Sequence, residues 1–130
     1  IKYKKESLKM TFEATEDRCQ RNGTIIQGGF TTVMMDSCMA FLVMELTDFI
    51  YTPMSIDINV SFLSAGSPGK LFCESKIIKL GNSIGFSSAE LYQNEKIIAK
   101  ASSSLKLIKL GEPKDFLIEN MAKDAKIIKA

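Results

Sequence analysis

The chain has 130 residues, a net charge of +2 and scattered rather than clustered basic residues. This length predicts one domain with its own core, and the scatter excludes the basic face that nucleic-acid binding requires. Histidine is absent, which excludes Ser–His and Cys–His catalysis and most zinc sites.

The three cysteines are widely spaced, and no CxxC or other metal-binding spacing is present. We therefore expect free, buried thiols in a reducing, cytoplasmic compartment, and no metal site. The longest stretch without a polar residue runs from Cys38 to Met44. That is far shorter than the ~20 residues that span a bilayer, so no membrane span is predicted.

The first half of the chain predicts a strand, a turn and one long helix. Residues 6–14 alternate with the period of a half-buried strand, and the residues at 21–23 signal a turn. Gly28 and Gly29 then precede residues 30–49, which contain no Gly or Pro and carry apolar residues in every helical direction. A helix that is apolar all round is expected to be buried all round.

Four strand-like segments follow, at 54–64, 70–80, 83–93 and 96–110, separated by short turns such as Asn94-Glu95. Long strands joined by short turns favour an antiparallel meander. The alternation in the first segment places Ile56, Ile58, Val60 and Phe62 on one face, and Ser55, Asp57, Asn59 and Ser61 on the other.

The C-terminal residues predict an amphipathic helix that starts near Pro113, which suits a first helical turn. Such a helix would either dock on its own domain or bind a partner or a second copy. The expected organisation is a single domain over 1–110 and a helical extension over 111–130.

Asp36 is a lone carboxylate inside the most apolar segment, and no Lys, Arg or His lies between Arg21 and Lys70. An ionised carboxylate is costly to bury unless it is paired or hydrogen-bonded. Asp36 is therefore either a functional group or a buried Asp that caps polar backbone at a subunit contact.

One buried helix with a meander of long strands predicts an α+β hot-dog fold, in which an antiparallel sheet wraps around the helix. The chain also resembles this fold family in detail through "IQGGFTTVMMD" (26–36), "SIDINVSFLSAGSPGKL" (55–71) and "GNSIGFSSAELYQNEKIIAKAS" (81–102). The resemblance covers roughly residues 8 to 108. It is closest to the PaaI-type acyl-CoA thioesterases, relatives of the 4-hydroxybenzoyl-CoA thioesterases.

The resemblance implies an enzyme that hydrolyses small to medium acyl-CoA or aryl-CoA, with coenzyme A as part of the substrate and no cofactor. Asp36 would be the nucleophile or the base that activates water. The N–H of Gly28 would hold the thioester oxygen. Ser55 matches a serine that positions the water or the carboxylate, although a plain strand serine is the alternative. For Gly28-Gly29 the alternative is a helix entry turn or close helix–sheet packing.

Further positions are carried over from the family as substrate contacts. Gly29, Thr32 and Phe62 would contact the substrate. Asn22 lies near a polarising Asn or Gln of the family, but it needs a one-residue shift from Arg21 and could be a turn residue. Asn82, Ser83 and Ile84 are expected to contact the pantetheine arm. Lys79 and Lys106 would contact the CoA phosphates, or alternatively be solvated surface lysines.

The sequence departs from the family at Gln27, where the family usually has His. Glutamine donates a hydrogen bond but cannot deliver a proton at neutral pH. This departure favours an alternative function, an acyl-CoA binding module with little turnover. A hot-dog dehydratase would need the missing histidine. The family's site is shared between subunits, so the resemblance implies a homodimer or homotetramer.

Overall fold

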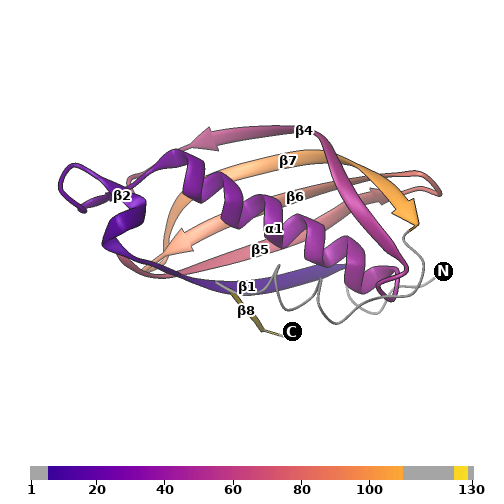
Figure 1. The fold of residues 1–130 in the computed structure, drawn as a ribbon, viewed down its shortest axis with the longest axis horizontal. Coiled ribbons are helices and arrows are strands. Elements are labelled where there is room, and N and C mark those ends of the chain that lie inside the picture. The colour runs from indigo at the N-terminus through magenta and orange to yellow at the C-terminus, as the bar shows by residue number, and fades with distance from the viewer. Residues whose placement is uncertain (1–5, 110–124, 129–130) are drawn as a thin grey trace.

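The computed structural model describes residues 6–109 and 125–128. One long helix, α1 (Gly28–Leu46), packs on one face of a six-stranded antiparallel sheet with strand order β4-β7-β6-β5-β1-β8 (Figure 1). The strands of this sheet are β1 (Ser7–Ala14), β4 (Tyr51–Phe62), β5 (Gly69–Leu80), β6 (Ile84–Gln93), β7 (Lys96–Lys109) and β8 (Ala125–Ile128). The short 3-10 helix η1 (Glu16–Arg18) and the strands β2 (Cys19–Gln20) and β3 (Ile25–Ile26) connect β1 to α1.

The predicted helix is confirmed, with its ends shifted by a few residues. It begins at Gly28, after Gln27 in an extended conformation. It ends at Leu46 because Asp48 and Phe49 adopt left-handed backbone angles, with φ of 52° and 59°. The Phe49 N–H donates to the Met44 carbonyl at 2.8 Å, a bond that closes the end of a helix in this way.

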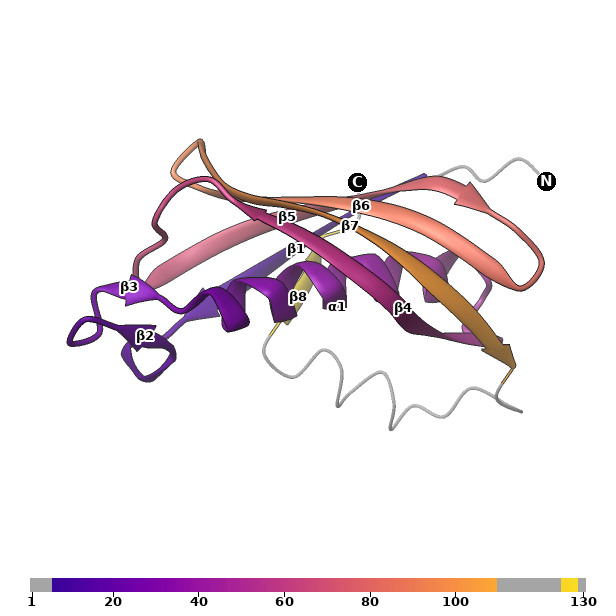
Figure 2. The ribbon, with the colours of Figure 1, turned by 90° about the horizontal axis from the view of Figure 1, so that it is seen from above.

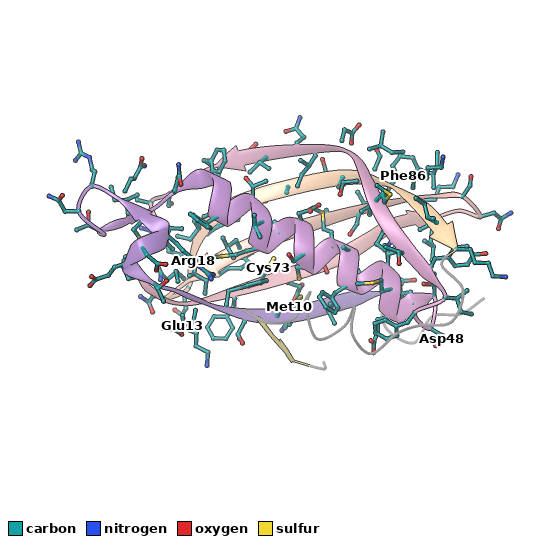
Figure 3. All side chains as sticks on the ribbon, viewed as in Figure 1. Met10, Glu13, Arg18, Asp48, Cys73 and Phe86 are labelled. Carbon is teal, nitrogen blue, oxygen red and sulfur yellow. The ribbon has the colours of Figure 1, made fainter. Side chains whose placement is uncertain are left out.

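The core lies between α1 and the concave face of the sheet, which curves over one side of the helix (Figure 2). Figure 3 shows Met10 of β1 and Cys73 of β5 alongside α1 in the middle of the molecule. Large side chains that are fully buried come from the helix and from four strands: Met35, Met39, Phe41 and Leu42 from α1, and Met10, Leu71, Leu91, Ile98 and Leu105 from the sheet.

Burial of the helix on all sides is confirmed only for its C-terminal half, where Cys38 through Met44 are all buried. In the N-terminal half the prediction is wrong. Val33 is 58% exposed, Gly29 is exposed and Asp36 is half-buried. The sheet covers one side of the helix, so the opposite side of its first turns stays open in a single chain.

By length and composition alone α1 could cross a membrane, but more than half of it is buried inside the structure. The core helix of a globular domain passes the same test. Its contacts with the sheet therefore account for its apolar character.

The predicted four-strand meander is confirmed for β5, β6 and β7 and is wrong for β4, which does not pair with β5. β5 pairs with β6 and β6 with β7, all antiparallel. Asn94 and Glu95 both have positive φ, 49° and 65°, as the tight turn of a two-residue hairpin requires. β4 precedes these three strands in the chain and pairs with the last of them, β7. It therefore lies at one edge of the sheet.

The helix predicted over 111–130 is wrong at Ala125–Ile128, because these residues form β8 and pair with β1. The apolar and polar residues of this short segment suit either structure, and the free edge of β1 decides between them. Residues 110–124 lie outside the described part of the chain.

Candidate active site

A β-bulge in β4 sets the side of the sheet on which Ser55 lies. Ser55 pairs with Leu105 and Ile58 pairs with Ser103, and the register shifts between Ser55 and Asp57. Leu105 and Ser103 are both buried on the helix-facing side, and paired residues share a face. Ser55 therefore lies on the same face as Ile58, and the predicted strict alternation, with Ser55 on the opposite face, is wrong.

Asp36 of α1 has a partner on this strand. The Ser55 hydroxyl donates a hydrogen bond to Asp36 Oδ1 at 2.7 Å. Asp36 is half-buried and Ser55 is exposed, so the carboxylate combines a fixed orientation with access from solvent. The lone carboxylate of the apolar segment is thus neither buried nor unpaired.

The first turn of α1 supplies two backbone N–H groups, from Gly28 and Gly29, that have no acceptor within the helix. The positive end of the helix dipole lies there, so this turn favours negative charge. Gln27 precedes the turn with an exposed side chain that makes no capping hydrogen bond.

Phe62, the last residue of β4, covers Gly28. A methyl group at Gly28 would lie 3.0 Å from Cε1 of the Phe62 ring, so the absence of a side chain lets the ring approach the helix. A methyl group at Gly29 would meet nothing within 4 Å. The two glycines therefore differ: one contacts an aromatic ring and the other faces open space.

A strip of exposed and half-buried residues connects the first turn to the carboxylate. Gly29, Thr32, Val33 and Asp36 follow one another at helical spacing on this open side. The Thr32 hydroxyl donates to the Gly28 carbonyl at 2.8 Å, which ties this side chain to the helix backbone. The strip is a path along which a substrate can lie.

Several predicted contacts lie elsewhere. Lys106 alternates with buried Leu105 and Leu107 and pairs with Ile84, so both lie on the outer face of the sheet, away from the helix. Lys79 pairs with Phe86 on that same face. Within one chain the structure does not bring these three residues to Asp36.

Asn82 and Ser83 lie in the exposed turn between β5 and β6, where the Ser83 carbonyl accepts the Leu107 N–H at 2.9 Å. Asn22 lies in the turn between β2 and β3, at the end of the molecule where α1 begins (Figure 1). Its φ of 58° is left-handed, which matches a turn asparagine.

Sequence reasoning missed the residues that hold the bulge. The alternation places Asp57 among four polar residues on one face, and nothing in that pattern distinguishes it, Ser103 or Ser104 from their neighbours. The three consecutive serines at 102–104, inside a strand that otherwise alternates, were the signal available.

Cys38 and Cys73 are buried free thiols, as predicted, whereas Cys19 is only half-buried. The Cys38 sulfur lies 3.4 Å from Ser75 Oγ and 3.5 Å from the Cys73 carbonyl oxygen. The pKa of the Cys73 thiol lies well above its usual value. The main cause is its hydrogen bond with the Cys38 thiol, and the second cause is burial. Such a thiol is a core residue and a poor nucleophile.

Among the described residues, no group of three or more His, Cys, Asp or Glu side chains could hold a metal ion. A hollow of about 540 Å³ opens on the outer face of the sheet, lined in part by Lys9, Phe72, Glu74 and Tyr92. It lies on the opposite side of the sheet from the Asp36–Ser55 pair. The candidate site of a single chain is therefore an open surface on the helix side.

Comparison with known proteins relates this geometry to a family. Residues 23–99 match the family model of the thioesterase superfamily. That range includes the first turn of α1, Asp36 and Ser55. No curated protein has a significantly similar sequence.

Solved structures match most of the chain. A phenylacetic acid degradation-related protein of Ralstonia eutropha is 24% identical over 83% of this chain and 80% of its own, with a TM-score of 0.75. The PaaI protein from the phenylacetic acid degradation operon of Escherichia coli is 17% identical over 83% and 77%, with a TM-score of 0.71. A Streptococcus mutans protein solved with acetyl-CoA is 15% identical over 86% and 89%, with a TM-score of 0.72. The predicted hot-dog fold is confirmed by these likenesses.

Proposed function

The chain belongs to the thioesterase superfamily, and from this premise we propose that it hydrolyses small or medium acyl-CoA or aryl-CoA to a free acid and CoA. One observation carries the proposal: the carboxylate of Asp36 is held by the Ser55 hydroxyl at 2.7 Å and stays open to solvent. A hydrolase that lacks histidine needs such a group, because a positioned carboxylate can act as base or as nucleophile.

In the general-base route, Asp36 takes a proton from water as the water oxygen bonds to the thioester carbon. The carbonyl oxygen becomes an oxyanion, which first-turn N–H groups stabilise. The oxyanion then collapses, the C–S bond breaks, and the proton passes to the leaving CoA sulfur. In the nucleophilic route, Asp36 itself bonds to the carbon and expels CoA, and water then hydrolyses the resulting anhydride.

Both routes need a second copy of the chain. Asp36 follows Gly28 by eight residues, which places the carboxylate and the first-turn N–H groups about 12 Å apart along the helix axis. One thioester carbonyl cannot contact both groups at that separation. We therefore propose a homodimer, or a tetramer built from it, in which the carboxylate of one copy faces the first turn of the other.

β4 is the surface that suits this pairing. It is an edge strand, and its Met54, Ile56 and Phe62 side chains are each more than half exposed. An exposed apolar edge strand is a template for pairing with another chain. Pairing two β4 strands across a twofold axis would bring both Asp36–Ser55 pairs to one interface.

The remaining contacts follow from this assembly. Gly29, Thr32 and Phe62 would line the acyl group along the open strip. A substrate held mainly by one copy would extend its CoA arm to a second copy. The contacts on that second copy would be Lys79, Asn82, Ser83, Ile84 and Lys106. The acetyl-CoA bound to the Streptococcus mutans protein supports CoA as the ligand. We propose a cytoplasmic enzyme that needs no cofactor.

The test is release of free thiol from a panel running from acetyl-CoA through palmitoyl-CoA, with phenylacetyl-CoA and hydroxybenzoyl-CoA as aryl members. Turnover of at least one member, abolished in Asp36→Ala, is the expected result. No turnover of any member at micromolar enzyme would contradict the hydrolase.

Gln27 favours the second candidate, an acyl-CoA binding module. Its exposed side chain stands at the first turn of α1, where an acid for the leaving sulfur would be placed, and it supplies none. Calorimetric binding of acetyl-CoA without thiol release would select this candidate over the enzyme.

A further inference from the structure

We propose that Asp57 is a positioning residue for Asp36, because it holds the bulge that turns Ser55 toward the carboxylate. Asp57 itself pairs with Ser104 and therefore lies on the outer side of β4, the face turned away from the helix. The kinetic consequences rest on the proposed function, whereas the effect of Asp57 on the position of Ser55 can be tested without any activity.

The register of β4 against β7 shows what the bulge does. Met54 pairs with Lys106 and Ser55 with Leu105, and after the shift Asp57 pairs with Ser104. Ile56 is the extra residue, and its side chain is 57% exposed. Without the extra residue, side chains before and after this point would keep strict alternation, and a slip of one residue moves a side chain to the other face.

Two hydrogen bonds from β7 hold this bulge in place. The Ser104 N–H donates to Asp57 Oδ1 at 3.1 Å, and the Ser103 hydroxyl donates to the Asp57 carbonyl oxygen at 2.7 Å. A bulge disrupts the regular ladder and leaves backbone groups to be satisfied. Asp57 is the residue at which both bonds meet, one at its side chain and one at its backbone.

The bulge determines whether Ser55 can bind the carboxylate of Asp36. Only with the bulge in place does Ser55 share the helix-facing side with Ile58, and only from that side can its hydroxyl reach Asp36 at 2.7 Å. The side-chain bond of Asp57 therefore acts on the Ser55–Asp36 pair through the backbone of the one intervening residue, Ile56.

The test compares Asp57→Ala with Asp57→Asn, whose amide oxygen can still accept the Ser104 N–H. Asn59→Ala is the matched control, since Asn59 is exposed on the same strand and face. Misplacing a catalytic group by about 1 Å costs up to about 100-fold, so kcat should fall at least about tenfold in Asp57→Ala. KM should stay within about twofold, and Asp57→Asn should retain most of the rate.

A double-mutant cycle with Ser55→Ala separates this role from a general structural one. If Asp57 acts through Ser55, Asp57→Ala should cause little further loss once the Ser55 hydroxyl is gone. An equal fractional loss in both backgrounds would overturn the proposal, as would a wild-type rate in Asp57→Ala.

A crystal structure of Asp57→Ala distinguishes failure of this inference from failure of the proposed function. We expect the Ser55–Asp36 hydrogen bond to be lost or the β4 register to change. An intact bond in that structure overturns the positioning role whether or not the protein is an enzyme. Absence of thiol release by the wild-type protein would overturn the hydrolase and leave this structural test in force.

Discussion

The ring of Phe62 rests on Gly28: a methyl group at this glycine would stand 3.0 Å from Cε1 and 3.2 Å from Cζ of the ring. The end of β4 thus meets the start of α1, 34 positions earlier in the chain. Phe62 is also 59% exposed, so the ring has room to turn aside.

Gly28→Ala should leave the fold intact, because the exposed ring can move, and should reduce kcat by about 10- to 100-fold, because the methyl group crowds the first-turn N–H groups. Thiol-release kinetics and circular dichroism measure the two effects. The double variant Gly28→Ala/Phe62→Ala is the control. Recovery of the rate in it would mean that the ring clash, rather than the covered N–H groups, caused the loss.

Asp36→Asn should fold like the wild type, since the amide oxygen can still accept the Ser55 hydroxyl. Removing the base or nucleophile should lower thiol release by at least about 100-fold. Calorimetry with acetyl-CoA should show that binding persists. A variant that keeps more than about a tenth of the wild-type rate would exclude Asp36 as the catalytic carboxylate.

Gln27→His should be harmless to the fold, because the Gln27 side chain is exposed and caps no helix N–H. An imidazole beside the leaving sulfur would add a titrating acid. We expect a new inflection in the pH–rate profile between about pH 6 and 7.5, and faster turnover where thiolate protonation limits the rate. An unchanged profile would place residue 27 away from the reacting thioester.

Ile56→Lys should weaken the proposed dimer, because it places a charge on the exposed edge strand. Ile78→Lys is a matched control: Ile78 also lies at a bulge, in β5 within the sheet, and is 64% exposed. Sedimentation should show a shift toward monomer for Ile56→Lys and the wild-type assembly for Ile78→Lys. A fully active monomer would contradict the shared site.

The free energy of unfolding should fall as the pH rises above about 8.5, the ordinary pKa of a thiol. The hydrogen bond between the two thiols, and then burial, raise the folded-state pKa of Cys73, whereas the same bond lowers the pKa of Cys38. Cys38 therefore gives up its proton first in the folded chain, and the decline at higher pH belongs to Cys73. In this pH range the unfolded chain loses the Cys73 proton before the folded chain does, and stability declines with pH. Urea titrations between pH 7 and 10 should show a shallower decline for Cys73→Ala. Lost packing lowers the whole curve without altering its slope, so equal slopes would refute the assignment.

The long helix, the hairpin turn and the candidate carboxylate could be predicted from local patterns. Residues 28–46 avoid Gly and Pro beyond the first two positions, and Asn94-Glu95 is a turn whatever surrounds it. Asp36 stood out because its neighbours are apolar. These signals depend on a residue and its nearest neighbours along the chain, so contacts with distant segments do not change the structure that they predict.

The features that could not be predicted depend on partners elsewhere in the chain. The bulge at Ile56 is decided by the Ser103 and Ser104 bonds to Asp57, so alternation alone placed Ser55 on the wrong face. Likewise β8 forms because β1 offers an edge, and the open side of α1 near Val33 depends on how far the sheet reaches. None of these is visible in a short window of sequence.

The position of β4 in the sheet also sets the order in which the molecule can assemble. β5, β6 and β7 form successive hairpins, whereas β4 has β7 as its only strand neighbour among the described residues and must wait for it. Pairing of distant segments is slow compared with hairpin closure, so Ser55 meets Asp36 late in folding. The same strand should be among the first to open again, and its amides should exchange with solvent ahead of those in β6.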